Sequence, residues 1–272
     1  MPTAPIQRQP IAPLDLGLKL VTDFFQAIPN LSYRIGNALR QAFDEVIDGP
    51  RTGRYCIEQL EKTEKTYIGT KVEIVLRVEL DLQRGLVLDN LIGGYEVDTK
   101  FSLTGNWMIP REAVGHLCLL VRGSDTSGLF GVGLLRTTPE MLTSGVNQDG
   151  KATVSAFGKR HIIWLIKDAA MVRNFVLDLD DATRLAILSP NSGKQRLLSL
   201  FRNVNDAIIP RSAILQVAQL KGDPLKRARE AKATLLKEGI RVLCATYLEE
   251  RELMKSFGVG TPKDDDWLSI RI

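Results

Sequence analysis

The segment 95–101, YEVDTKF, sets the strongest limit on how this chain can fold. It follows a glycine pair at 93–94 and alternates between charged and mostly apolar side chains. Residues two apart on a β-strand share a face, so Asp98 and Lys100 point to the same side of the predicted strand. If the glycine pair forms the turn, Asp89 lies on the neighbouring strand and can converge with Asp98. We therefore predict paired strands that gather charges at one point of a sheet.

The alternation alone has two interpretations. A strand with one face in water has the same pattern as a strand that carries a metal site. Asp89 favours the metal site, because two carboxylates at one point repel each other unless a cation lies between them, and such oxygen ligands suit Mg²⁺. The ammonium of Lys100 could balance the carboxylates, contact a scissile phosphate, and orient or help deprotonate the attacking water. The spacing D-x(8)-D-x-K thus supplies the parts of a phosphodiesterase.

Composition limits the class of protein further. The chain has 272 residues, 44% of them hydrophobic and 25% charged, which is ordinary for a globular protein and enough for two domains. No apolar run reaches the roughly 20 residues of a membrane span, and the first residues lack the apolar block of a signal peptide. Three distant cysteines favour a reducing, cytoplasmic location, and only two histidines are present, so any metal must be held by carboxylates. We expect no membrane partner and no nucleotide cofactor.

Period and turn signals predict an N-terminal part made of helices followed by strands. The predicted helices are at 14–27, 32–47 and 57–61, with a further short one from Thr138-Pro139. The predicted strands are at 86–88, 95–103, 116–121 and 130–135. This order of elements is typical of an α/β (α+β) layered domain. Residues 143–159 have no clear period and predict a loop leading out of the domain, after which 161–170 resume helical spacing.

The C-terminal part is mostly helical and basic. Residues 193–241 contain 11 basic and 4 acidic side chains, a net charge of +7, against +4 for the whole chain. The predicted elements are helices at 195–204, 210–219 and 223–238 and a strand at 240–245. Two short helices joined by a tight turn, with a strand after them, match a winged helix-turn-helix.

Four basic residues lie on the second helix of this motif: Lys226, Arg227, Arg229 and Lys232. Such a cluster has two interpretations, a solvated basic face and a surface that binds a polyanion. The helix-turn-helix context favours DNA binding, with some side chains on phosphates and others on guanine edges.

Further segments carry a resemblance to known nucleases. Asp89 followed by Asp98-Thr99-Lys100 resembles the PD-(D/E)xK nuclease motif, with Leu88 in place of the usual proline. More specifically, most of the chain resembles the NaeI family of restriction endonucleases. The segments that carry this resemblance are RTGRY at 51–55, KTEKT at 62–66, GTKVE at 69–73, EVDTKFS at 96–102, WMIPREAVGHL at 107–117 and NQDGK at 147–151.

The resemblance implies a Mg²⁺-dependent type II enzyme that hydrolyses both strands of duplex DNA. It implies that Asp89 and Asp98 bind the metal together with the carbonyl of Thr99, and that Lys100 is catalytic. It also implies a homodimer that binds two copies of a palindromic site, one as substrate and one as effector. A GC-rich site such as GCCGGC is expected for an enzyme of the same specificity as NaeI.

The same resemblance implies the domain organisation. A PD-(D/E)xK endonuclease domain, with a mixed sheet flanked by helices, is expected over 1–160. A linker is expected at 161–172, and a winged-helix effector domain at 173–272. Our boundary from composition and the basic block at 193–241 agree with this division.

The segment 70–81, TKVEIVLRVELD, gives conflicting signals. Its alternation favours a strand, whereas Thr70-x-x-Glu73 after Gly69 resembles a capping box and favours a helix start. Gly-x-x-x-Glu before the Asp pair is also similar to the MutH mismatch-repair nuclease, where this segment is a helix and its Glu joins the site. We therefore predict a helix, with Glu73 either a fourth catalytic and metal-binding residue or only a helix cap.

Two other functions compete with a site-specific endonuclease. A DNA-binding regulator with an inactive nuclease fold would bind a specific site without cutting it. A MutH-like nickase would cut one strand only. The complete set of Glu73, Asp89, Asp98 and Lys100 argues against the first, and the predicted winged helix argues against the second.

Overall fold

The computed structural model describes residues 15–219 and 222–272. The first residues of the chain, where we expect no signal peptide, lie outside these ranges. The chain divides into two compact units. The first unit contains the described residues up to Ser32, with Leu80–Arg122 and Gly131–Lys167. The second unit contains Tyr33–Glu79, Gly123–Phe130 and Asp168–Ile272. No helix within the described ranges is long and apolar enough to cross a membrane.

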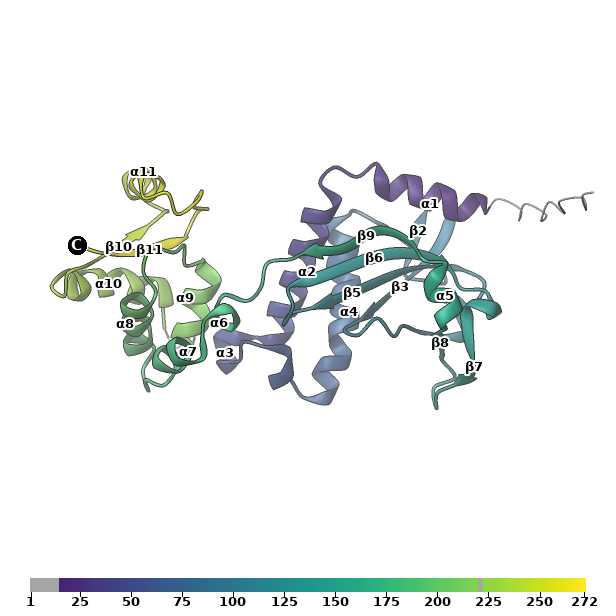
Figure 1. Ribbon diagram of the computed structural model, residues 1–272, viewed down its shortest axis with the longest axis horizontal. Helices are drawn as coiled ribbons and strands as arrows, with labels where there is room; N and C mark the ends of the chain where they lie inside the picture. The colour runs from purple at the N-terminus through teal and green to yellow at the C-terminus, as the bar shows by residue number, and fades with distance from the viewer. Residues whose placement is uncertain (1–14, 220–221) are drawn as a thin grey trace, which may run out of the picture. The chain divides into compact units, whose positions relative to one another are not determined.

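A six-stranded mixed sheet forms the main sheet of the fold (Figure 1). In order across the sheet, its strands are β1 (Gln83–Arg84), β2 (Asn90–Ile92), β3 (Tyr95–Ser102), β5 (Leu117–Ser124), β6 (Leu129–Arg136) and β9 (Ile163–Ala170). Strand β3 pairs antiparallel with β2 through the predicted glycine turn, and parallel with β5. The α+β fold class is confirmed, and so are the strands expected at 95–103, 116–121 and 130–135.

Three predictions for this part of the chain were wrong. Residues 86–88 are not a strand but a loop between β1 and β2. The expected loop at 143–159 contains β7 (Leu142–Val146), β8 (Ala152–Val154) and α5 (Ala156–Arg160); β4 (Met108–Ile109), β8 and β7 form a second, three-stranded sheet. The segment 161–170, expected to be helical, contains β9 at the edge of the main sheet. Short strands in exposed sheets carry few apolar residues, so their pattern is weak.

The first unit also contains the short 3-10 helices η2 (Arg111–Ala113) and η3 (Pro139–Met141) and helix α1 (Leu16–Gln26), which confirms the helix predicted over 14–27. Asp15 caps it, accepting a hydrogen bond from the backbone of Leu18 at 2.9 Å. The same carboxylate pairs with Arg136 at the end of β6. The cap and the ion pair therefore fix the start of the helix through one side chain.

The helix prediction for 70–81 is confirmed, but the reason given for its start was wrong. Helix α4 runs over Lys62–Glu79, so Thr70 lies in its interior and cannot be an N-cap. The helix begins instead where the carboxylate of Glu64 accepts the backbone N–H of Glu61 at 2.8 Å. Glu64 also holds both guanidinium nitrogens of Arg54, at 2.8 and 3.0 Å. The capping-box interpretation of Glu73 is therefore excluded.

The remaining elements of the second unit are mostly helical, as predicted (Figure 1). They are α2 (Leu31–Ile47), α3 (Gly49–Thr52), η1 (Ile57–Gln59), α6 (Phe175–Asp178), α7 (Asp181–Leu188), α8 (Gly193–Asn203), α9 (Arg211–Ala218), α10 (Pro224–Leu236), β10 (Ile240–Cys244), α11 (Leu248–Ser256) and β11 (Trp267–Arg271). Asp223 caps α10 with Pro224 in its first turn, as the sequence predicted. Strands β10 and β11 pair antiparallel as a two-stranded sheet.

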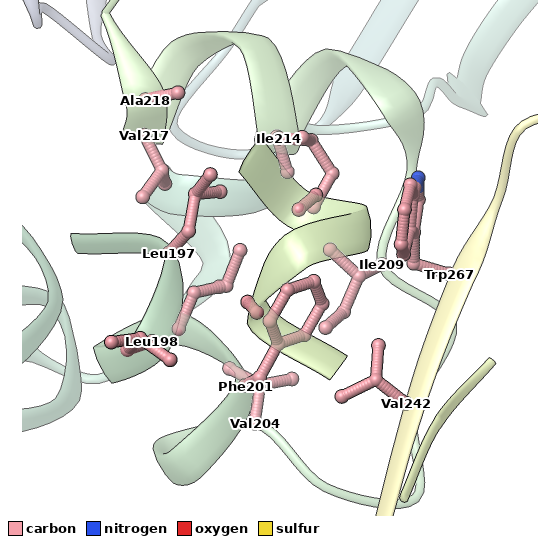
Figure 2. Close-up of a cluster of buried hydrophobic side chains, with 14 of the residues drawn as sticks. Leu197, Leu198, Phe201, Val204, Ile209, Ile214, Val217, Ala218, Val242 and Trp267 are labelled. Atoms are coloured by element: carbon pink, nitrogen blue, oxygen red, sulfur yellow. The ribbon is translucent and has the colours of Figure 1, made fainter. Parts of the chain in front are cut away.

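A buried apolar cluster holds α8, α9, α10 and the two-stranded sheet together. Figure 2 shows Phe201 of α8 at its centre, with Trp267 of β11 and Ile214 of α9 beside it. The rings of Phe201 and Trp267 have centroids 5.9 Å apart. Both side chains are almost completely buried, so this contact joins helices to a sheet that could not be stable as a lone pair of strands.

Truncating Phe201 tests the importance of this cluster. Phe201→Ala removes a fully buried ring, and we expect the free energy of unfolding to fall by about 3–5 kcal/mol. Urea unfolding followed by the fluorescence of the neighbouring Trp267 measures this loss. Leu185→Ala is the matched control, because Leu185 lies on α7 of the same unit and is 68% exposed. Equal losses for the two variants would contradict the assignment of the core.

Candidate active site

Asp98 lies in the middle of β3, between β2 and β5. Strand β3 alternates as predicted, and the parallel register sets Asp98 opposite Cys118 of β5. Only 4% of Asp98 is exposed, and Cys118 is fully buried. The thiol of Cys118 lies 3.9 Å from a carboxylate oxygen of Asp98 and 3.6 Å from the hydroxyl of Thr137. Asp98 therefore points into a partly dry site with a sulfur atom beside it.

Asp89 immediately precedes β2 and reaches across to β3. Its carboxylate accepts the backbone N–H of Thr99 at 2.7 Å. The amide of Asn90 donates to the hydroxyl of Thr99 at 2.9 Å, and both of these side chains are buried. Asp89 therefore holds the backbone of Thr99, and Asn90, the next residue, holds its side chain. These bonds set the position of Asp89 relative to Asp98.

Lys100 completes the cluster. Its ammonium lies 2.7 Å from Asp98, 3.8 Å from Asp89 and 3.2 Å from the carbonyl oxygen of Thr99. The structure therefore brings together Asp89, Asp98, Thr99 and Lys100, four of the residues that the sequence singled out. Glu73 lies in the second unit, on α4, where it pairs with Arg77 at 2.5 Å.

Burial and charge shift the titration of this cluster. Burial raises the pKa of Asp98 to about 7, although the nearby ammonium of Lys100 opposes the rise and Asp89 adds to it. For Lys100, burial would lower the pKa, but the carboxylates of Asp98 and Asp89 outweigh burial and raise it. The ammonium thus stays protonated at neutral pH, whereas Asp98 keeps its proton to a higher pH than an ordinary aspartate does.

Glu96 supports the site from the same strand face. Its carboxylate accepts backbone N–H groups of Leu86 at 2.8 Å, Val87 at 3.4 Å and Leu88 at 2.9 Å. These bonds, with that to Leu88 the largest contributor, hold the pKa of Glu96 below its usual value. Glu96 therefore fixes the loop that leads directly into Asp89.

The oxygen atoms of this site fit a hard divalent cation. Within residues 15–219 and 222–272 no group of three or more His, Cys, Asp and Glu side chains could hold a metal ion. A metal here would therefore need the carbonyl oxygen of Thr99 and water besides the carboxylates of Asp89 and Asp98. The raised pKa of Asp98 fits this, because a divalent cation would favour the ionised form that burial alone penalises.

Some residues at this site were not anticipated from the sequence. Asn90 acts through the hydroxyl of Thr99, Cys118 meets Asp98 through the register of β3 and β5, and Thr137 contacts Cys118. The hydroxyl of Thr137 donates to the carbonyl of Ala113 at 2.7 Å and so anchors the layer below Asp98. For Asn90, the sequence signal was its place next to Asp89, since adjacent residues can bind one partner from two sides.

The basic residues predicted on α10 differ in their surroundings. Lys226 and Arg229 are exposed, and Arg227 is half-buried. The ammonium of Lys232 lies 2.7 and 2.5 Å from the two carboxylate oxygens of Glu250 on α11. It also lies within cation–π distance of the rings of Tyr247 and Trp267. Lys232 therefore joins α10 to α11, whereas Lys226 and Arg229 present their charge to solvent.

Two carboxylates and a lysine on adjacent strands of a mixed sheet are typical of nucleases that use a divalent metal ion. A family model described as Restriction endonuclease NaeI matches residues 19–272. The type II restriction enzyme NaeI of Lentzea aerocolonigenes is 37% identical over 250 residues, covering 88% of this chain and 78% of that enzyme. The chain therefore belongs to the NaeI restriction endonuclease family, and the sequence-based assignment to a restriction endonuclease is confirmed.

The pKa of Asp98 predicts how the metal-free protein responds to pH. A folded-state pKa of about 7, above the ordinary 3.8, means that the folded state binds this proton more tightly than the unfolded state does. Stability from this group is therefore greatest in acid and is lost as the pH rises towards 7. The Asp98→Asn variant cannot ionise at this position. We therefore expect its free energy of unfolding, relative to that of the wild type, to rise by about 2 kcal/mol as the pH goes from 5 to 8.

Urea unfolding in the presence of a chelator, at both pH values, measures this difference. Asp149→Asn is the control for loss of one carboxylate, because Asp149 is exposed in the same unit. A gain for Asp98→Asn that is the same at pH 5 and pH 8 would contradict the raised pKa.

Proposed function

We propose that this chain is a Mg²⁺-dependent type II endonuclease that cuts both strands of duplex DNA at a short palindrome. The observation that carries the proposal is the convergence of Asp89, Asp98 and Lys100 on adjacent strands. Membership of a restriction endonuclease family supplies the substrate class. A GC-rich sequence such as GCCGGC is the first candidate for the site, because of the similarity to NaeI.

The chain's own residues have separate tasks in this mechanism. Asp89, Asp98 and the carbonyl of Thr99 would hold the metal, which supplies a water of lowered pKa and stabilises charge at the phosphorus. Thr99 keeps Asp89 in place through its N–H. Lys100 has a raised pKa, so we assign to its ammonium a contact with the scissile phosphate and the orientation of the water, rather than removal of a proton.

Glu73 remains the proposed fourth member of the catalytic set. It lies in the middle of α4, partly buried, and does not cap the helix. The ion pair with Arg77 orders the side chain. We propose that Glu73 either binds a metal or holds a water near one.

The C-terminal part is the proposed effector domain. Helices α9 and α10 with the pair β10–β11 have the order of a winged helix-turn-helix, and α10 would enter the major groove of a second DNA copy. The proposed domains are 1–160 and 173–272, joined by 161–172. Strand β9 lies within that last segment, so only its last few residues lie outside the sheet. A homodimer would match the symmetry of a palindrome.

Lys100→Ala tests the catalytic proposal. Removing the ammonium takes away the proposed stabilisation of the scissile phosphate, so we expect cleavage to fall by about 10²–10⁴-fold. DNA binding should change little. Plasmid digestion with Mg²⁺ and a gel-shift assay measure the two properties. Lys19→Ala on α1 is the matched control, since Lys19 is an exposed lysine of the same unit.

Other results of the plasmid digestion distinguish the alternatives. Discrete linear fragments from the wild type support the proposal. Tight, site-specific binding with no cleavage in any metal would favour an inactive regulator. Accumulation of nicked circles without linear product would favour a nickase.

Arg229→Ala tests the proposed DNA surface on α10. Loss of one phosphate contact should weaken binding at every sequence and reduce the slope of log K against log salt concentration by about 0.9. Loss of a base contact would instead relax specificity at one position. Lys237→Ala is the matched control, because Lys237 is an exposed lysine just past the C-terminal end of the same helix. Identical salt slopes for wild type and Arg229→Ala would remove Arg229 from the interface.

A further inference from the structure

The loop that precedes Asp89 exposes two large apolar side chains. We call residues 85–88, GLVL, the tip loop; it joins β1 to β2. Leu86 is 94% exposed and Val87 is 70% exposed, whereas Leu88 is buried. Leu86 is the most exposed of the large apolar side chains in the part of the chain that the structure describes. Single exposed apolar residues are common, but two adjacent ones beside a proposed active site need a reason.

The tip loop is held rigidly in place. The carboxylate of Glu96 accepts three consecutive N–H groups from it, and Gly85 donates to the carbonyl of Asp89 at 3.3 Å. There is no room for a side chain at Gly85, since a Cβ there would collide with the carboxylate of Glu96 and the carbonyl of Leu88. A loop fixed in this way presents Leu86 and Val87 at little further entropic cost when a partner binds.

The tip loop also lies close to the proposed scissile phosphate. Glu96 and Asp98 are two residues apart on β3 and share a face, so their Cα atoms are about 7 Å apart. Glu96 bonds directly to the loop, and Asp89 follows it in the chain. Duplex DNA rises 3.4 Å per base pair, so the loop lies within about two or three base steps of the phosphate held at Asp98.

Duplex DNA is the partner that this position favours. Any duplex that brings a phosphate to Asp89, Asp98 and Lys100 must pass beside a loop only two base steps away. Apolar side chains in protein–DNA interfaces pack on sugars and thymine methyl groups or insert between base steps. A second copy of the chain has no comparable reason to lie at this point.

We propose that Leu86 and Val87 form an apolar contact with the nucleotides that flank the scissile phosphate and help to seat the duplex for cleavage. The contact rests on the proposed endonuclease function and adds a positioning element to it. The two residues touch neither the metal nor the reacting atoms. Glu96 keeps the contact in register with the site because it holds the loop and shares a strand with Asp98.

Protection of an introduced thiol tests the contact directly. All three native cysteines are buried, so Leu86→Cys adds one accessible thiol that a maleimide can label selectively. The Lys100→Ala background prevents cleavage of the bound duplex. A duplex fragment that the wild type cuts, as mapped on a plasmid, should slow labelling at position 86 by about tenfold or more, since a buried thiol is shielded from reagent. Leu16→Cys on α1, where Leu16 is 65% exposed, is the control and should stay reactive.

A cleavage assay gives a second readout. Leu86→Ser combined with Val87→Ser should lower kcat/KM by about tenfold or more, because the apolar contact is lost. The unfolding midpoint should not change, since both side chains are exposed in the free protein. Glu96→Gln keeps the shape of the side chain and removes its charge, so it should loosen the tip loop and lower kcat/KM to a smaller extent.

Several results would overturn the proposal. One is a kcat/KM of the double variant within twofold of that of an active wild type. Another is a thiol at position 86 that reacts equally fast with and without DNA. Protection that grows with protein concentration in the absence of DNA would assign the tip loop to a contact between copies of the chain. Failure of the proposed function is recognised separately, as absence of cleavage by the wild type on any plasmid, and would overturn both.

Discussion

The bond from the N–H of Thr99 to the carboxylate of Asp89 is the interaction on which the site depends. It takes the place of a bond that the strand pair could otherwise make between backbones, and it draws one carboxylate to within reach of another. The ammonium of Lys100 lies near both carboxylates and balances part of their charge. The cluster therefore holds two carboxylates close together by means of a proton on Asp98 and the charge of Lys100.

Much of the site could be predicted because it depends on local geometry. The period of a strand set Asp98 and Lys100 on one face, and the glycine turn brought Asp89 beside them. Cys118 could not be found in this way, because its approach to Asp98 depends on a parallel pairing between residues some 20 positions apart. The register of such a pair is decided by packing over the whole sheet, and no short segment of sequence specifies it.

The errors in the fold have similar causes. The apolar residues 86–88 predict a strand, but Glu96 binds their N–H groups and holds them out of any sheet. Helix α4 begins at Lys62, eight residues before the start at residue 70 that the sequence suggested, and Glu64 caps it. In the helical C-terminal part, strong caps and regular apolar spacing left fewer alternatives, and there Asp223 begins α10 as expected.

The pair of Lys232 and Glu250 has a consequence for how such an enzyme could change over evolution. It binds α10 to α11 through a charge that faces the protein, while Lys226 and Arg229 on the same helix make no comparable bond. If α10 binds DNA as proposed, structural and recognition roles would belong to different side chains of one helix. Exposed positions can be substituted without unfolding the helix that carries them, so a lineage could drift to a new DNA sequence while the scaffold stays intact.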